Sequence, residues 1–202
     1  MTARQQWSIV GAIVLVLAIG LTIAARSMKD DLYPIEPGSV APNFTARVLG
    51  DTTHKTFNAN YKGKVTVLNV WATYCEPCKA EIPSLEKLHK MYGDSGLQIV
   101  AVENDKAVSD DSVRKFIKAF GATFEVLRET SGAIDNQYQT TGIPETFIIG
   151  PEGTIRRKWI GADDWTSQGN RALIAQLLGL KTPRPVAEIA DTAKKDSLRA
   201  AR

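Results

Sequence analysis

The stretch Trp71-Ala-Thr-Tyr-Cys75-Glu-Pro-Cys78-Lys-Ala-Glu81-Ile-Pro83 contains both cysteines of the 202-residue chain. The run before it, residues 64–71, is short, apolar and rich in β-branched residues, which predicts a buried strand, whereas the residues after Cys78 show helical spacing. A helix is therefore predicted to begin at or near Cys75. The unpaired N–H groups and the positive dipole end of such a helix favour a thiolate, so Cys75 is the expected nucleophile.

Two cysteines at this spacing form a disulfide with little movement, so the pair is suited to thiol–disulfide exchange, with Cys78 as the resolving thiol. Two alternatives remain open. A purely structural disulfide would close a very short loop, which contributes little stability. Half of a zinc site would need two further ligands, and neither His54 nor His89 stands at ligand spacing to a partner. We expect neither a cofactor nor a metal.

The composition fits one globular domain with appendages, because 44% of the residues are hydrophobic. The formal net charge is only +3. Basic residues form no stripe interleaved with aromatic residues, so no nucleic-acid partner is predicted.

An uncharged run near the amino terminus predicts a membrane anchor. Residues 7–25 would cover most of the ~30 Å hydrocarbon core of a bilayer at ~1.5 Å per helical residue. Residues 1–6 then form a short cytoplasmic segment, and residues 26–39 form a tether. A cleaved signal peptide is the alternative, although Ala24-Ala25 is a poor match to its cleavage site. The flanking charges are balanced and do not orient the segment.

Residues 40–180 are predicted to form one α/β domain, and residues 181–202 a charged, flexible tail. A β-hairpin of residues 44–49 and 53–57 comes first. Strands then alternate with helices, which favours a sheet covered by helices on both faces. The further strands are predicted at 65–70, 97–102, 124–127, 145–149 and 154–160, and the helices at 75–92, 110–120, 133–139 and 166–178.

Several short motifs resemble a known family over residues 40–178. They are Ala41-Pro-Asn-Phe44, Lys62-Gly-Lys-Val65, Leu68-Asn-Val-Trp-Ala72, Cys75-Glu-Pro-Cys78, Gly142-Ile-Pro-Glu-Thr-Phe147 and Pro151-Glu-Gly153. Together they resemble the membrane-anchored, extracytoplasmic thioredoxin-like proteins of the TlpA, ResA and CcmG (DsbE-like) group. The resemblance implies a thioredoxin fold, in which helices flank a central mixed β-sheet, here with the hairpin as an amino-terminal extension. It also implies a single-pass protein of the bacterial inner (cytoplasmic) membrane, with its soluble domain on the periplasmic side.

The resemblance further implies that the Ile143–Pro144 peptide bond is cis and lies opposite the cysteine pair. Pro144 would position the substrate backbone, and Ile143 would pair with an extended substrate strand. The active-site loop around the cysteines would be completed by Trp71, Tyr74, Glu76 and Pro77.

The proton of Cys78 needs an acceptor when this thiol resolves a mixed disulfide. Cytosolic thioredoxins carry an aspartate at the position of Asn69, which is not a base. Glu81 is the best candidate, because helical spacing places it with Cys78 on an otherwise apolar stripe, and burial would raise its pKa toward neutrality. The alternative is a solvated glutamate that pairs with Lys79 or Lys87.

The residues between the cysteines favour a reducing couple. Strongly oxidising relatives have a histidine there, which stabilises the thiolate, whereas Glu76 opposes thiolate formation. We therefore expect a disulfide reductase. By resemblance, its clients are the cysteine pair of apocytochrome c, which we rank first, or that of an oxidase subunit awaiting copper. Its electron donor would be a membrane thiol protein of the CcdA or DsbD type.

Two other functional classes use similar residues. A peroxidase of the peroxiredoxin type requires a proline-containing nucleophile loop, which the residues before Cys75 lack. A non-enzymatic Cu(I) carrier would use both thiolates as soft ligands.

Overall fold

The computed structural model of the chain describes residues 3–27 and 34–185, which belong to two units divided after Pro34. The first unit is helix α1 (Ala3–Ser27). Among the described residues, no helix combines the length and the apolar character that a bilayer crossing requires. Much of the predicted tether and most of the predicted tail lie outside the described residues.

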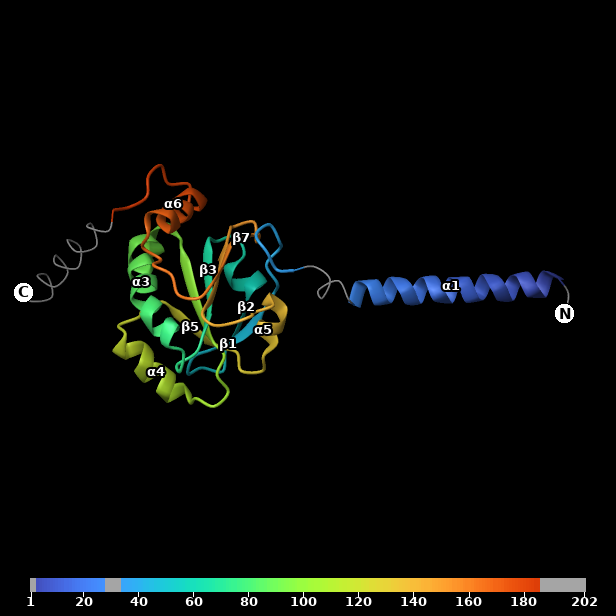
Figure 1. Cartoon of the computed structure of the whole chain (residues 1–202), viewed down its shortest axis with the longest axis horizontal. Helices are drawn as coiled ribbons and strands as arrows, with labels where there is room; N and C mark the ends of the chain where they lie inside the picture. The colour runs from blue at the N-terminus through green and yellow to red at the C-terminus, as the bar shows by residue number, and fades with distance from the viewer. Residues whose placement is uncertain (1–2, 28–33, 186–202) are drawn as a thin grey trace, which may run out of the picture. The chain divides into compact units, whose positions relative to one another are not determined.

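The second unit is built on a seven-stranded mixed sheet with the strand order β2-β1-β5-β4-β3-β6-β7 (Figure 1). The central strands β5, β4 and β3 are parallel, β6 and β7 continue the sheet in antiparallel steps, and the β1–β2 hairpin extends its other side. The strands are β1 (Thr45–Val48), β2 (His54–Thr56), β3 (Thr66–Trp71), β4 (Gln98–Glu103), β5 (Glu125–Arg128), β6 (Glu145–Ile149) and β7 (Ile155–Ile160). The helices are η1 (Phe57–Tyr61), α3 (Glu76–Tyr92), η2 (Gly93–Ser95), α4 (Asp110–Ala119), α5 (Ala133–Tyr138) and α6 (Gln168–Leu177).

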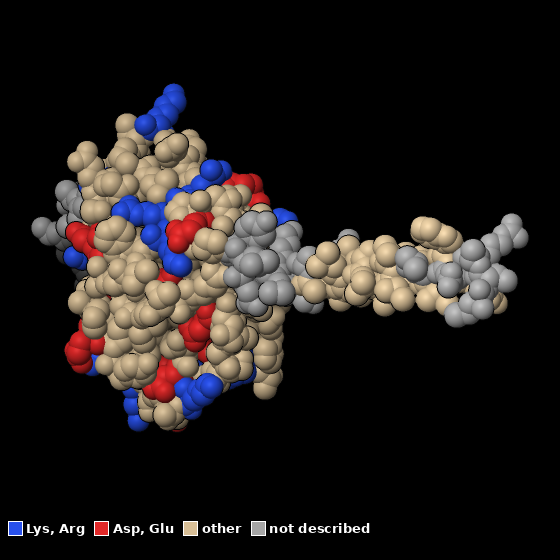
Figure 2. Space-filling view, turned by 45° about the vertical axis from the view of Figure 1, so that its right-hand side comes forward, with Lys and Arg blue, Asp and Glu red and all other residues tan. Residues whose placement is uncertain are grey.

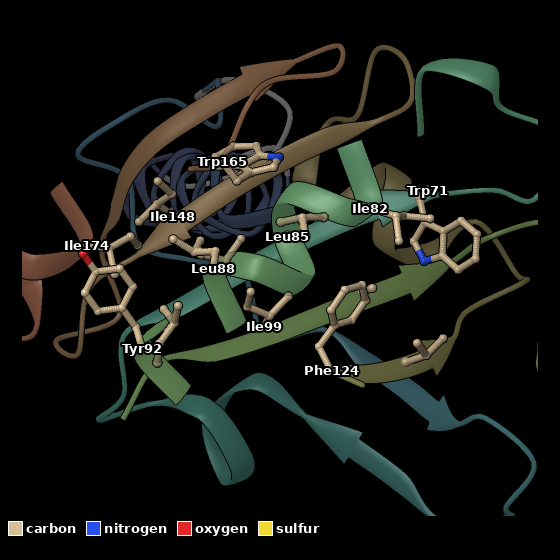
Figure 3. Close-up of a cluster of buried hydrophobic side chains, with 14 of the residues drawn as sticks. Trp71, Ile82, Leu85, Leu88, Tyr92, Ile99, Phe124, Ile148, Trp165 and Ile174 are labelled. Carbon is tan, nitrogen blue, oxygen red and sulfur yellow. The ribbon is translucent and has the colours of Figure 1, made fainter. Parts of the chain in front are cut away.

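Helices cover both faces of the sheet, as the alternation of strands and helices predicted. Successive strand residues point to opposite faces, so Val67 and Leu68 of β3 belong to two separate cores. One core lies under α3, α4 and α6 (Figure 3). The other lies under η1 and α5. The central strands are buried on both faces, and the Cys-x-x-Cys segment follows one of them.

The second strand of the predicted hairpin extends one residue too far at its carboxyl end. The hairpin prediction extended the second strand to Phe57, but β2 ends at Thr56 and a π-helical turn, η1, follows. The Thr56 side chain caps this turn by accepting a hydrogen bond from the Ala59 N–H. Phe57 and Tyr61 are thereby buried against Phe44. Burial of two aromatic side chains outweighs the extended preference of the preceding residues.

The first residues of the predicted tail are held by the folded unit. The Arg184 N–H donates to the Tyr92 hydroxyl at 2.9 Å, and its guanidinium donates to the Met91 carbonyl at 2.7 Å and to Ser95 Oγ at 2.8 Å. The folded unit therefore includes Arg184, four residues beyond the predicted boundary at residue 180.

Figure 2 shows acidic and basic side chains interspersed over one face of the second unit. In the same view, the described side chains of α1 carry no charge.

Candidate functional site

The two cysteines lie where β3 passes into α3. The helix begins at Glu76, and Cys75 is its N-cap residue: its Sγ accepts a hydrogen bond from the Cys78 N–H at 3.2 Å. The predicted start of this helix is confirmed. The two sulfurs form a disulfide with an S–S distance of 2.08 Å. Cys75 is 6% exposed and Cys78 is fully buried, so the first sulfur is the more accessible one.

The wall around the disulfide is apolar. Both cysteines belong to the same core cluster as Trp71 and Ile82, and the half-buried Ile143 packs against that cluster. Outside the disulfide, the described residues contain no group of three or more side chains suited to holding a metal ion.

The Ile143–Pro144 peptide bond is cis. Strand register places this bond near the cysteines, because Val70 lies opposite Glu145 in the β3–β6 pair and the next step brings Trp71 and Pro144 together. Pro144 is buried, and its carbonyl accepts a hydrogen bond from the Gly161 N–H at 2.8 Å. The backbone of Ile143 has no partner among the turn and loop hydrogen bonds of the described residues.

Glu81 is buried on the apolar stripe of α3, at 1% exposure. Its carboxylate accepts hydrogen bonds from Asn69 Nδ2 at 2.7 Å and from Trp165 Nε1 at 2.9 Å. Burial raises the pKa of Glu81 to about 7, although the hydrogen bonds from Trp165 and Asn69 act to lower it. The solvated alternative is thereby excluded, since Lys79 pairs with Glu76 instead.

Sequence reasoning missed the partners that hold Glu81. The sequence identifies Asn69 only as a residue that cannot act as a base, but its amide bridges the Glu81 carboxylate and Thr146 Oγ1, the latter at 2.8 Å. An amide on an inward-facing strand position is a signal that could have indicated this role. Trp165 comes from the loop before α6, and no local pattern ties it to Glu81.

Of the other four residues predicted in the active-site loop, three lie at the surface. Tyr74 is 66% exposed, and Glu76 and Pro77 are exposed as well, while Trp71 is buried. The ion pair of Glu76 with Lys79 offsets the negative charge on which the argument for a reducing couple depended. The Glu76 side chain therefore favours a reducing couple less than its position in the sequence indicates.

The AhpC/TSA family profile matches residues 37–158, which include the cysteines, the buried glutamate and the cis-proline. The chain belongs to this family. Within it, the protein is a thioredoxin-like thiol–disulfide oxidoreductase of the ResA/DsbE-like group, and its substrates are proteins that carry cysteines.

Two curated relatives and one solved structure support this placement of the ResA-like protein. Thiol-disulfide oxidoreductase ResA of Bacillus subtilis is 38% identical over 146 residues, which cover 71% of this chain and 77% of that protein. Thioredoxin-like protein YneN of the same organism is 34% identical, with coverages of 78% and 91%. The crystal structure of a putative thiol:disulfide interchange protein DsbE from Chlorobium tepidum matches with a TM-score of 0.60 at 26% identity. That match covers 72% of this chain and 97% of the other. The predicted thioredoxin-like fold of the ResA-like protein is confirmed.

Proposed function

We propose that the protein is a membrane-tethered disulfide reductase for extracytoplasmic cysteine pairs, acting in c-type cytochrome maturation. The observation that carries this proposal is the combination of an N-capping Cys75 sulfur with a buried carboxyl, Glu81, one helical turn beyond Cys78. A purely structural disulfide gives no reason to bury an ionisable group on that stripe, because desolvation makes the burial costly.

In the reaction we propose, the Cys75 thiolate attacks a client disulfide and forms a mixed disulfide, and one client sulfur leaves. Cys78 gives its proton to the Glu81 carboxylate and attacks the Cys75 sulfur. The second client sulfur then leaves, so the client gains two electrons and the protein is left with the Cys75–Cys78 disulfide. A membrane thiol protein of the CcdA or DsbD type restores the dithiol by the same exchange.

The backbone next to the cis-proline serves as the docking strand for the client. Ile143 offers N–H and C=O groups without partners among the described turn and loop hydrogen bonds, and Pro144 places them just before β6, beside Trp71 in the β3–β6 register. Main-chain pairing of this kind binds many sequences, and the exposed Tyr74 adds an apolar contact beside the attacking sulfur.

The apolar wall supports the reducing direction of the couple. Both sulfurs belong to a core cluster, and desolvation disfavours the thiolate. Strong oxidants have a reduced form that is stabilised as a thiolate, and a buried sulfur lacks this stabilisation, so the couple is more reducing. A glutathione redox titration is expected to give a potential well below the about −120 mV of a strong periplasmic oxidant. A value that high would reverse the proposed direction.

The tether is part of the same proposal. Residues 7–25 carry no charge, and we assign them as an uncleaved anchor between a cytoplasmic segment, 1–6, and a tether, 26–39. The domain of residues 40–180 is placed on the periplasmic side. Carbonate extraction of membranes should leave the full chain in the pellet, and protease added to spheroplasts should degrade the domain. Recovery of a shortened, soluble chain would favour a cleaved signal peptide.

A trapping experiment tests the function itself. In the Cys78→Ala variant the first step is possible and the second is not, so Cys75 should accumulate as mixed disulfides with its clients, which mass spectrometry can identify. The Cys75→Ser/Cys78→Ala variant is the control and should give no adduct. Adducts with apocytochrome c support the proposal. Adducts confined to a copper-binding oxidase subunit would instead identify that subunit as the client and overturn the role in cytochrome c maturation. Tight Cu(I) binding without adducts or disulfide reduction would contradict the reductase proposal and favour the Cu(I) carrier.

A further inference from the structure

Four side chains form a row across the sheet at the end that carries the cysteines. The register pairs Trp71 of β3 with Glu103 of β4, Glu103 with Arg128 of β5, and Arg128 with Arg47 of β1. Trp71, Glu103 and Arg128 are 1%, 0% and 6% exposed. A buried glutamate therefore lies on the strand next to the one that enters the active-site loop, and a buried arginine lies one strand further.

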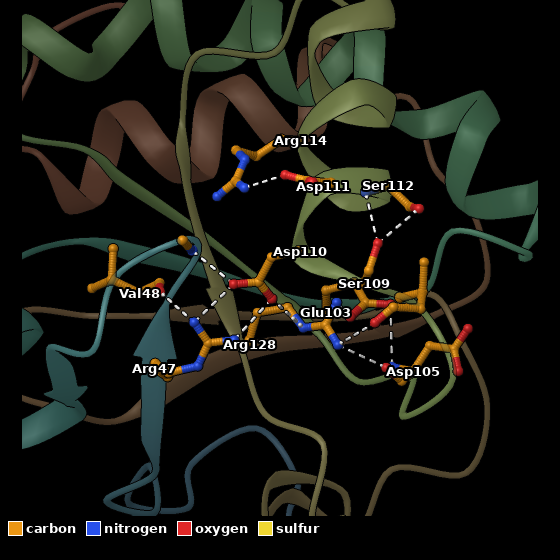
Figure 4. Close-up of polar contacts among 12 residues, drawn as sticks. Arg47, Val48, Glu103, Asp105, Ser109, Asp110, Asp111, Ser112, Arg114 and Arg128 are labelled. Atoms are coloured by element: carbon orange, nitrogen blue, oxygen red, sulfur yellow. Dashed lines mark hydrogen bonds and ion pairs between the residues drawn. The ribbon is translucent and has the colours of Figure 1, made fainter.

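Acidic and basic side chains alternate from Glu103 through Arg128 and Asp110 to Arg47, where Asp110 comes from α4 and not from the sheet (Figure 4). Glu103 Oε2 lies 3.0 Å from Arg128 Nη1. The Arg128 guanidinium also donates to the carbonyls of Asp105 and Val108, at 3.0 Å each. The Asp110 carboxylate lies 3.9 Å from Arg128 Nε and 2.8 Å from Arg47 Nη2.

Backbone contacts connect Glu103 to the loop before Cys75. The Asn104 N–H donates to the Trp71 carbonyl at 3.1 Å, and the Thr73 N–H faces the Glu103 carboxyl and favours its charged form. Thr73 precedes Cys75 by two residues, so at most about 7 Å of chain separates them. The Cys75 N–H donates to the Ala72 carbonyl at 3.2 Å, which makes the loop turn tightly above the row.

We propose that Glu103 and Arg128 form a positioning pair that sets the reactivity of Cys75: the arginine neutralises the carboxylate that faces the loop at Thr73, so the attacking sulfur is next to little net charge. This inference rests on the proposed role of Cys75 as the nucleophile. Neither residue touches the sulfur, and both act through the loop.

The energetics of buried charges support a role beyond stability. A buried ion pair is a weak source of folding free energy, since apolar side chains of similar size serve as well or better. Two charged residues face Glu103: Arg128, which is positive, and Asp105, which is negative. The Asp105 N–H also donates a hydrogen bond to the Glu103 carboxylate at 3.2 Å. Desolvation raises the pKa of Glu103 to about 7, against the attraction of Arg128. The net charge of the Glu103–Arg128 pair behind the loop therefore changes when either residue is replaced.

The test is the pH dependence of Cys75 alkylation by iodoacetamide in the reduced full chain, read above pH 7, where Glu103 is charged. Glu103→Gln leaves Arg128, Asp110 and Arg47 with one net positive charge, which should lower the thiol pKa of Cys75 by about half to one unit. The double variant Glu103→Gln/Arg128→Gln has no net charge at this point. Its thiol pKa should return to within a few tenths of the wild-type value.

The matched control is Glu86→Gln. Glu86 is also a buried glutamate that accepts a backbone N–H, from Thr123, and pairs with a cation, Lys90. It lies on α3, more than two helical turns beyond Cys75, and does not contact the loop before that cysteine. It should leave the thiol pKa unchanged even if it lowers stability. An unshifted pKa in Glu103→Gln, or a double variant shifted further than the single one, would overturn the proposal. If the double variant does not fold, the contrast between Glu103→Gln and Glu86→Gln decides. Preferential alkylation of Cys75 over Cys78 in the wild type tests the nucleophile assignment separately.

Discussion

At the scale of single residues, the site depends on one carboxyl group placed where the fold disfavours its charge. Glu81 lies on α3 between buried apolar side chains, and Asn69 and Trp165 hold both of its oxygens. With a pKa of about 7 it is present in both protonation states at neutral pH. A group of that kind is suited to accept a proton from Cys78 and to return it later.

Replacing Glu81 by glutamine should slow the resolving step. Removal of a positioned general base typically costs about 10²-fold or more, and the rise of the wild-type rate as pH increases through about 7 should disappear. Stopped-flow measurement of the decay of a preformed mixed disulfide, between pH 5 and 9, checks both features. The alkylation rate of Cys75 is the internal control and should change little. A Glu81→Gln variant that keeps the wild-type pH profile would remove Glu81 from the mechanism.

The sequence was sufficient to predict the cysteines, the buried glutamate and its raised pKa, because each follows from spacing on a single helix. It was not sufficient for the residues that orient them. The hydrogen bond between Trp165 and Glu81 joins positions 84 residues apart, and the contact of Glu103 with Arg128 depends on a strand register. Such pairings arise from the three-dimensional packing of elements, and a single sequence carries no local signal for them.

At the scale of helices and strands, local rules predicted most elements to within a few residues. The strand prediction for residues 65–70 corresponds to β3 (Thr66–Trp71), and the helix prediction for 75–92 to α3 (Glu76–Tyr92). Capping residues explain this success, since Cys75, Ser109 and Ser167 each accept a hydrogen bond at the start of a helix. The π-helical turn η1 was missed because its stability comes from burying Phe57 and Tyr61, not from backbone propensity.

The start of α4 offers a direct test of this capping argument. Ser109 Oγ accepts from the Ser112 N–H at 3.2 Å, so Ser109→Ala should lower the free energy of unfolding by about 1 kcal/mol. Urea denaturation of the oxidised protein measures the difference. Ser112→Ala removes an exposed hydroxyl from the same turn and keeps the capping acceptor, so its effect should be much smaller. Equal effects of the two substitutions would show that the cap contributes nothing specific.

At the scale of the whole molecule, buried carboxyl groups make stability depend on pH. Glu81 and Glu103 both have a pKa of about 7 in the folded protein, above the usual value of 4.5. The folded state therefore binds protons more tightly than the unfolded state between these values. The stability that this provides is fully present below pH 4.5 and is lost as the pH rises through 7. Asp110 acts in the opposite direction, because Arg47 lowers its pKa, and its contribution is lost in acid.

The free energy of unfolding should accordingly fall between pH 5 and pH 8, and Glu81→Gln should reduce that fall. At pH 8 the variant should be about 1–3 kcal/mol more stable than the wild type, because it need not bury a negative charge. Denaturant titrations of the oxidised proteins at the two pH values measure this difference. The exposed Glu76→Gln should behave like the wild type, and a Glu81→Gln variant less stable at pH 8 than at pH 5 by the full wild-type amount would contradict the assignment.

The pairing of β3 with β6 also determines when the chain becomes reactive during its synthesis. The strand that leads to the cysteines is held on one side by residues 145–149, so a nascent polypeptide has no cis-proline platform until translation has passed residue 149. Contacts of such high sequence separation form late in folding. Exchange-competent geometry is thus confined to chains in which residues 145–149 have been made, which limits unproductive mixed disulfides of shorter nascent chains.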